Sequence, residues 1–114
     1  MKTILIVDDD QDVLIDLERA LEDAGFSTTT AWGREEALRL LEGARFDLLL
    51  IDEDLCVLNF PILMGQFKRS QPKAVLLLMH TRKSSCGKSD LAEASMCKWE
   101  HDKVKARVRG CLAA

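Results

Sequence analysis

The sequence predicts an α/β fold in which a parallel sheet is covered by helices on both faces. Apolar segments alternate with amphipathic ones along the chain, and the apolar segments show no polar alternation of their own. Strands that are apolar throughout are typical of a parallel sheet buried on both sides. In addition, two of these segments, ILIV at 4–7 and LLLI at 48–51, run directly into aspartates.

The expected elements form a repeated strand–helix pattern, since helical segments place apolar residues three and four positions apart. We expect an aspartate to cap the first helix, Gly25 and Gly43 to end the first two helices, and Pro61 to lie in the first turn of the third. Strands are expected at Thr3–Val7, Ser27–Trp32, Asp47–Ile51, Ala74–Met79 and Ser95–Trp99. Helices are expected at Gln11–Ala24, Arg34–Leu41, Asn59–Arg69 and Asp102–Leu112, with at most a short one near Asp90–Ala94.

The length of 114 residues suits one domain, which is predicted to span residues 1–114. No apolar run approaches the roughly 18 residues of a membrane span, and the acidic stretch after Val7 does not fit a signal peptide. We therefore expect a cytoplasmic protein. The cysteines lack metal-binding or redox spacing, so we expect thiols that are mostly buried. They are Cys56, Cys86, Cys97 and Cys111.

Charge is distributed unevenly between the two halves of the chain. Residues 1–57 carry 15 acids and 5 bases, whereas residues 58–114 carry 4 acids and 11 bases. The acidic half is suited to holding a cation. For the basic half we favour an ordinary solvated surface over a nucleic-acid interface.

Acidic side chains follow the first and third predicted strands at the point where each strand ends. Asp8 and Asp9 follow the first strand, and Asp52 follows the third. Ligands of open parallel sheets bind outside the carboxyl ends of the strands, so these carboxylates converge if the two strands are neighbours. Hard oxygen ligands suit Mg²⁺. A carboxylate beside a divalent metal is the apparatus of phosphoryl transfer to aspartate.

The stretches ILIVDDD, FDLLLIDEDL and WEHDKVKARVRGCL, in this order, resemble a receiver domain of the response regulators of two-component signalling. The resemblance covers nearly the whole chain. Within the family, the chain is similar to stand-alone receivers of the chemotaxis-regulator type. It implies a flavodoxin-like, doubly wound sheet of five parallel strands in the order 2-1-3-4-5. It also implies a phosphoacceptor and not an enzyme, phosphorylated on Asp52 by a histidine kinase or phosphotransfer protein with Mg²⁺ as cofactor.

The same resemblance assigns roles to five further residues. Asp8 and Asp9 match the acidic pair that binds Mg²⁺, and Asp9 is expected to be the more direct ligand. The backbone carbonyl of Asp54, two residues after the acceptor, completes the implied metal site. Lys98 is the best match to the lysine that pairs with the phosphoryl group, and Thr81 is the candidate for the switch hydroxyl after strand four.

The sequence departs from the family pattern on one side of the domain. Of the loop after the acceptor only Asn59 remains, because the proline and glycines that shape it are missing. A direct count along the fourth strand places the position of the switch hydroxyl at Met79 or His80, neither of which has a hydroxyl group. Thr81 fits this position only if the alignment shifts by one or two residues. Cys97 is an alternative occupant of the lysine position. Residues 80–97 are few for a strand–helix–strand passage, so helix four is expected to be short or irregular.

The leading hypothesis is therefore a receiver that signals through a downstream protein at the surface of helix four, strand five and helix five. It implies no nucleic-acid or membrane contact and a monomer or weak dimer. The alternative is a degenerate receiver that binds its partner regardless of phosphorylation, since the switch residues are altered. A remote alternative is a phosphatase resembling the haloacid dehalogenases, suggested by D-x-D at 52–54; it would leave Asp8 and Asp9 unexplained.

Overall fold

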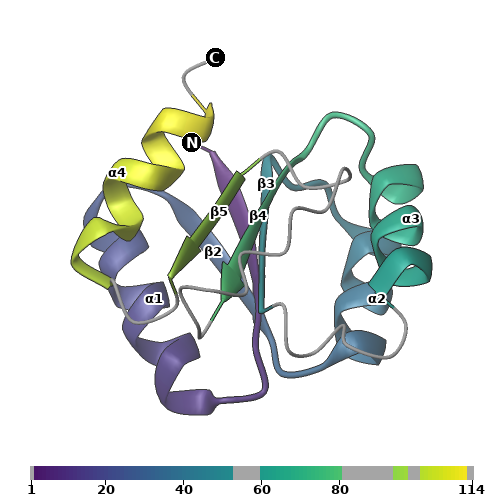
Figure 1. The fold of residues 1–114 in the computed structure, drawn as a ribbon, viewed down its shortest axis with the longest axis horizontal. Helices are drawn as coiled ribbons and strands as arrows, with labels where there is room; N and C mark the ends of the chain where they lie inside the picture. The colour runs from purple at the N-terminus through teal and green to yellow at the C-terminus, as the bar shows by residue number, and fades with distance from the viewer. Residues whose placement is uncertain (1, 53–59, 81–93, 98–100, 113–114) are drawn as a thin grey trace.

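The fold is a doubly wound α/β sandwich, seen in a computed structural model that describes residues 2–52, 60–80, 94–97 and 101–112 (Figure 1). Strands and helices alternate along most of the described chain, which is the connectivity of parallel sheets. The strands are β1 (Thr3–Val7), β2 (Ser27–Ala31), β3 (Leu48–Asp52), β4 (Val75–His80) and β5 (Ala94–Cys97). The helices are α1 (Gln11–Asp23), α2 (Arg34–Gly43), α3 (Phe60–Ser70) and α4 (His101–Leu112).

The strands pair in the order β2-β1-β3-β4-β5, and every pair is parallel. β1 and β3 lie side by side at the centre, with Val7 in register with Ile51. The strand order reverses at β1, because the chain adds β2 on one side of it and β3 on the other. The carboxyl edge next to β1 and β3 is therefore the place where an open α/β sheet binds ligands.

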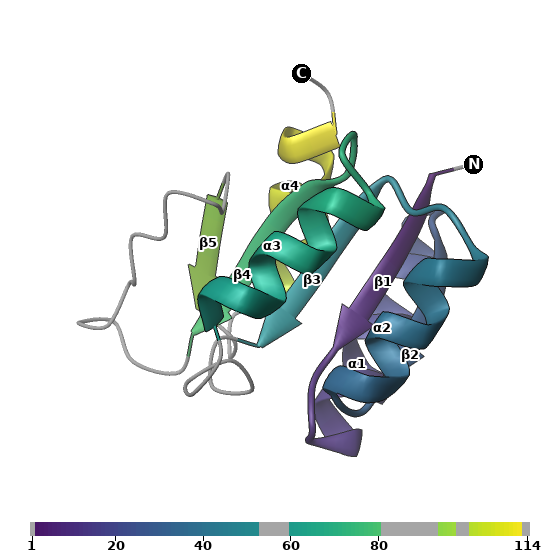
Figure 2. The same ribbon diagram turned by 90° about the vertical axis from the view of Figure 1, so that its right-hand side faces the viewer.

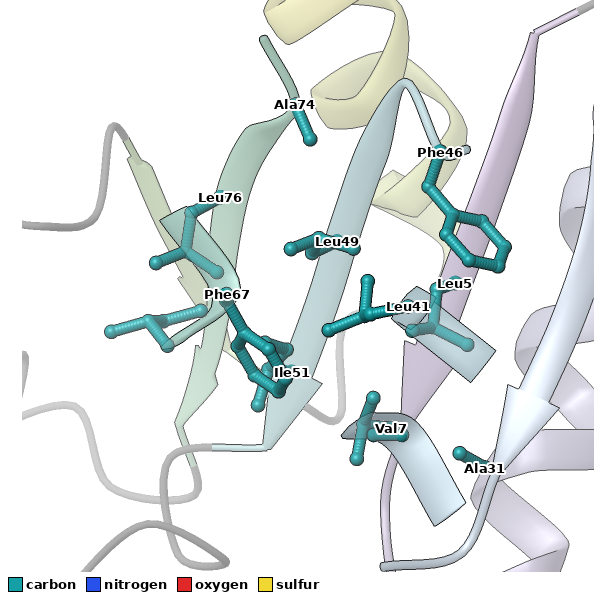
Figure 3. Packing of buried hydrophobic residues seen from close by; sticks show 12 residues of the cluster. Leu5, Val7, Ala31, Leu41, Phe46, Leu49, Ile51, Phe67, Ala74 and Leu76 are labelled. Atoms are coloured by element: carbon teal, nitrogen blue, oxygen red, sulfur yellow. The ribbon is translucent and has the colours of Figure 1, made fainter. Parts of the chain in front are cut away.

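Helices cover both faces of the sheet, with α1 and α4 on one side and α2 and α3 on the other (Figures 1 and 2). The alternation of side chains along each strand divides the core into two clusters. Along β3, Leu49 and Ile51 pack with Phe67 of α3, as Figure 3 shows, whereas Leu48 and Leu50 pack toward α1 and α4. This two-sided burial explains why the strands are apolar at every position.

The ends of the first helix follow the expected capping pattern. The Asp10 carboxylate accepts hydrogen bonds from the backbone N–H groups of Asp12 at 3.0 Å and Val13 at 3.4 Å. Gly25 follows the C-cap with φ of +95°, a conformation that glycine adopts at little cost. Gly43, which was expected to end α2, is the last helical residue, and Ala44 caps the helix in an extended conformation.

The predicted fold class is confirmed: the fold is α/β, the sheet is parallel and helices cover both faces. The expected bounds of the elements differ from the observed ones by one or two residues at most of the described ends, as is usual for termini that fray. Ala94, expected at the end of a short helix, lies instead in β5. Residues 53–59 and 81–93, which include the rest of that expected helix, lie outside the described residues. Within the described residues, no helix is long and apolar enough to cross a membrane.

Candidate functional site

The carboxyl ends of β1 and β3 bring two aspartates together. Val7 and Ile51 are partners in the strand register, so the next pair in that register is Asp8 and Asp52. Neighbouring strands lie about 4.8 Å apart, which sets the spacing of their backbones. Both residues also continue the side-chain alternation of Ile6 and Leu50, which faces α1 and α4. The sequence pattern thus fixes both the edge and the face of the site.

Three carboxylates form one cluster at this edge. One oxygen from each of Asp8, Asp9 and Asp52 lies within 4.8 Å of the others. Asp8 is fully buried and Asp52 is 1% exposed, whereas Asp9 is exposed. The cluster therefore has a buried floor of two carboxylates and a third that faces solvent. Among the described residues it is the one group of three or more side chains arranged to hold a metal ion.

The turn between β1 and α1 holds Asp8 in place. Its backbone N–H donates to the carbonyl of Ala31 at 3.1 Å, which extends the pairing of β1 with β2. Its Oδ1 accepts a hydrogen bond from the backbone N–H of Asp10 at 2.9 Å. Asp10 in turn caps α1, as predicted, so the third aspartate of the DDD run serves the helix and the first two serve the cluster. One turn therefore both starts a helix and orients a carboxylate.

The cluster fits a small hard cation. Mg²⁺ binds oxygen at about 2.0–2.1 Å, so ligand oxygens around it lie roughly 3–4 Å apart. The three oxygens, within 4.8 Å of one another, reach that spacing with a small inward movement. Three carboxylates without a cation repel one another, and two of them have little contact with water. The donor chemistry and the burial both favour a divalent cation at this position.

The structure tests only part of the predicted site. It brings together Asp8, Asp9 and Asp52, as the sequence suggested. Asp54, Thr81 and Lys98 lie outside the described residues. On β4, Met79 is the register partner of Asp52 and is fully buried. β4 ends at His80, directly before Thr81 in the chain.

One contribution to the site was missed by sequence reasoning. The carbonyl of Ala31, at the end of β2, anchors the backbone of Asp8. The segment STTTA of β2 is less apolar than the other strands, and the five residues are mostly half-buried at the edge of the sheet. The neighbouring positions of β1 and β2 could have been found only from the strand order, because a backbone carbonyl leaves no mark on the sequence.

A parallel α/β sheet with a carboxylate cluster at the ends of β1 and β3 is typical of signalling domains that accept a phosphoryl group on aspartate. Residues 4–97 match the family described as the response regulator receiver domain. The chain belongs to this family. Receiver domains of response regulators are phosphoacceptors and not enzymes in the usual sense, so the predicted family and class of protein are confirmed.

Sequence relatives lie among bacterial regulators. The chain is 44% identical over 62 residues to the transcriptional regulatory protein PrrA of Mycobacterium leprae, covering 54% of this chain and 24% of that protein. It is 33% identical over 79 residues to a response regulator receiver protein of Anaeromyxobacter, covering 69% of this chain and 33% of that protein. The chain thus aligns with about a quarter to a third of the length of these relatives.

Solved structures support the same fold. The response regulator TrrA of Thermotoga maritima, determined in complex with Mg²⁺ and BeF, is 25% identical, with a TM-score of 0.85 over 98% of this chain and all of that one. A CheY-like receiver domain from Methanospirillum hungatei is 24% identical, with a TM-score of 0.86 over 99% of this chain and 94% of that one. Membership of the receiver family does not favour the phosphatase alternative, which leaves Asp8 and Asp9 unexplained.

Proposed function

We propose that the protein accepts a phosphoryl group on Asp52 in a Mg²⁺-dependent reaction. The observation that carries this proposal is the convergence of Asp8, Asp9 and Asp52, whose oxygens lie within 4.8 Å at the switch point of a receiver sheet. Phosphoryl transfer to a carboxylate needs a nucleophilic oxygen and a neighbouring group that neutralises the charge of the incoming phosphoryl oxygens. The cluster supplies the first directly and the second through a bound cation.

The metal site is proposed to consist of Asp8, Asp9 and Asp52 with the backbone carbonyl of Asp54. When bound, Mg²⁺ would supply positive charge to the phosphoryl oxygens and neutralise the carboxylate cluster. Asp8, which is buried and fixed by the N–H of Asp10, holds the floor of the site. Asp9 is exposed, which suits a direct ligand that completes the site from the solvent side.

The proposed reaction transfers the phosphoryl group from a phosphohistidine to a carboxylate. An Oδ of Asp52 attacks phosphorus in line with the leaving nitrogen, the P–N bond breaks, and its electron pair stays on the imidazole. The product on this chain is an acyl phosphate, and the released imidazole takes a proton from solvent. We assign Lys98 to pairing with the phosphoryl group and Thr81 to the switch hydroxyl, on the family pattern.

The proposed partners follow from this chemistry. The donor is a histidine kinase or a phosphotransfer protein. A downstream protein binds the face that the family forms from helix four, strand five and helix five; in this chain β5 and α4 correspond to strand five and helix five. We propose a single receiver domain over residues 1–114, a sheet in which β5 is the fifth strand of the family order, and a cytoplasmic location. The described part of α4 carries exposed cations at Lys103, Arg107 and Arg109, which suit an acidic protein surface.

The experiment is phosphorylation with acetyl phosphate and Mg²⁺, followed by intact-mass measurement. One phosphoryl adduct is expected for the unmodified chain and none for Asp52→Asn. Asp23→Asn, which removes an exposed carboxylate at the far end of α1, is the matched control and should keep the adduct. Beryllofluoride should bind only when Mg²⁺ is present and Asp52 is intact.

A chain that never acquires the adduct, with Mg²⁺ in excess and the fold intact, would refute the proposal. That result would instead favour the degenerate receiver, which binds its partner irrespective of phosphorylation. An adduct that persists in Asp52→Asn would place the acceptor on another residue.

A further inference from the structure

A hollow of about 440 Å³ lies at the amino edge of the sheet, opposite the carboxylate cluster. Residues 45–47, which lead into β3, form one wall, and residues 70–74, which lead into β4, form the other. β3 runs from this edge to Asp52, and five residues of strand span about 17 Å. The volume is within the range of small-molecule sites, roughly 300–1,000 Å³. The hollow is therefore separate from the proposed phosphorylation site.

The two walls are fixed to each other by one buried side chain. Gln71 is 7% exposed, and its Oε1 accepts a hydrogen bond from the backbone N–H of Phe46 at 3.2 Å. Its Nε2 donates to the carbonyls of Leu41 at 3.1 Å and Ala44 at 2.8 Å. The amide thus joins the loop after α3 to the loop after α2 at three points. A hollow held in this way is preformed, which lowers the entropic cost of binding a ligand.

The hollow has an excess of available positive charge. Arg45 and Lys73 line it from opposite walls, both are exposed, and neither forms an ion pair within the described part of the chain. The one acid of the lining, Asp47, already accepts a hydrogen bond at Oδ2 from the backbone N–H of Thr3 at 2.8 Å. Two cations on separate walls can converge on one anionic group.

Backbone carbonyls at the ends of α2 and α3 also lie near this edge. Carbonyls without a hydrogen-bond partner carry partial negative charge and would repel an anion. Those of Leu41 and Ala44 accept hydrogen bonds from Gln71, and that of Phe67 accepts one from the backbone N–H of Gln71 at 2.8 Å. The carbonyl of Ala74 accepts a hydrogen bond from Lys68 Nζ at 3.3 Å. These four carbonyls therefore already have hydrogen-bond partners.

Ser70 and three apolar residues complete the lining. Phe46 and Ala74 are 6% and 3% exposed and lie at the same end of the core cluster in Figure 3. Pro72 adds a third apolar side chain to the lining. Pro72 is the exposed member of the three, so an apolar group on a ligand would bury apolar area mainly against Pro72.

We propose that this hollow binds a small organic anion, in which a phosphate or carboxylate lies between Arg45 and Lys73 and an attached ring packs against Pro72. The site does not depend on Asp52 or on a metal ion. It would give the receiver domain a second input, read at the amino edge of the sheet.

The test uses the ¹⁵N-labelled full chain in metal-free buffer, titrated separately with phenyl phosphate, inorganic phosphate and phenol. Phenyl phosphate is expected to shift the amide signals of Phe46, Asp47 and Lys73 saturably and to bind several-fold tighter than either fragment. Arg45→Gln and Lys73→Gln should each weaken binding about fivefold, the value of one partly exposed charge contact. The double variant Arg39→Gln/Arg69→Gln removes two positive charges, one more than either single variant, from exposed positions outside the lining and should change binding less than twofold.

Three results would overturn the proposal. The first is the absence of saturable shifts at these amides up to about 20 mM phenyl phosphate, a very weak affinity even for a fragment; Arg45 and Lys73 would then serve only the helix ends. The second is an equal loss of binding in the Arg39/Arg69 control, which would show attraction by overall charge. The third is equal affinity for inorganic phosphate, which would remove the role of the apolar lining.

Discussion

The amide of Gln71 is predicted to be the most important polar group in the described part of the domain that lies outside the carboxylate cluster. Gln71→Ala deletes three hydrogen bonds and leaves the N–H of Phe46 and the carbonyls of Leu41 and Ala44 without their protein partner. At about 1 kcal/mol for each bond, the free energy of unfolding should fall by about 3 kcal/mol. For a domain of this size, the thermal midpoint should fall by about 10 °C.

The assay is urea denaturation followed by far-UV circular dichroism, with Gln66→Ala as the matched control. Gln66 lies on α3 and is half-buried, so its truncation should cost well under 1 kcal/mol. Gln71→Glu separates donor from acceptor, because a carboxylate can accept from Phe46 but cannot donate to the two carbonyls. It should destabilise the protein at least as much as alanine. A loss for Gln71→Ala no larger than that of Gln66→Ala would refute this reasoning.

Three other predictions follow from the same structure. Asp8→Asn relieves the repulsion between the clustered carboxylates and keeps an acceptor for the N–H of Asp10, so it should stabilise the metal-free protein by about 1 kcal/mol. It should also abolish the rise in thermal midpoint that Mg²⁺ causes. An unchanged response to Mg²⁺ would contradict this prediction. Asp10→Ala removes the N-cap of α1 and should cost about 1 kcal/mol in urea denaturation; a change below about 0.3 kcal/mol would show that water caps the helix equally well. Leu50→Ala, at a fully buried site, should lower the free energy of unfolding in urea by about 2–5 kcal/mol. Trp32→Gln, at a side chain that is 61% exposed, should change it by less than about 0.5 kcal/mol. Similar losses in the two variants would contradict the burial of Leu50 in the core.

The carboxylate cluster could be predicted from the sequence because three rules agree on it. Apolar strands indicate a parallel sheet, parallel strands direct their carboxyl ends to one edge, and side-chain alternation places Asp8 and Asp52 on one face. Each rule depends either on a few neighbouring residues or on the fold class alone. None requires knowledge of a loop.

The Gln71 network could not be predicted in the same way. Its partners are backbone groups 25, 27 and 30 residues away, and any residue type carries such groups. The sequence shows only a glutamine before a proline at the end of a helix. Similarly, the sequence places the end of α2 at Gly43 but does not show that Ala44 caps the helix in an extended conformation, with its N–H donating to the carbonyl of Leu40. Local signals mark where a helix weakens, and tertiary contacts decide where it ends.

The two-sided burial of the sheet explains why both candidate sites lie at its edges. Every residue of β3 is buried, so a charged group inside the strand would lose its hydration on either face. Chemistry is then confined to the ends, where the chain leaves the core. At the carboxyl edge this places Asp52 beside Asp8, and at the amino edge it places Arg45 and Lys73 around a hollow fixed by Gln71. One strand therefore separates a site suited to a cation from one suited to an anion, and a substitution at either edge should leave binding at the other unchanged.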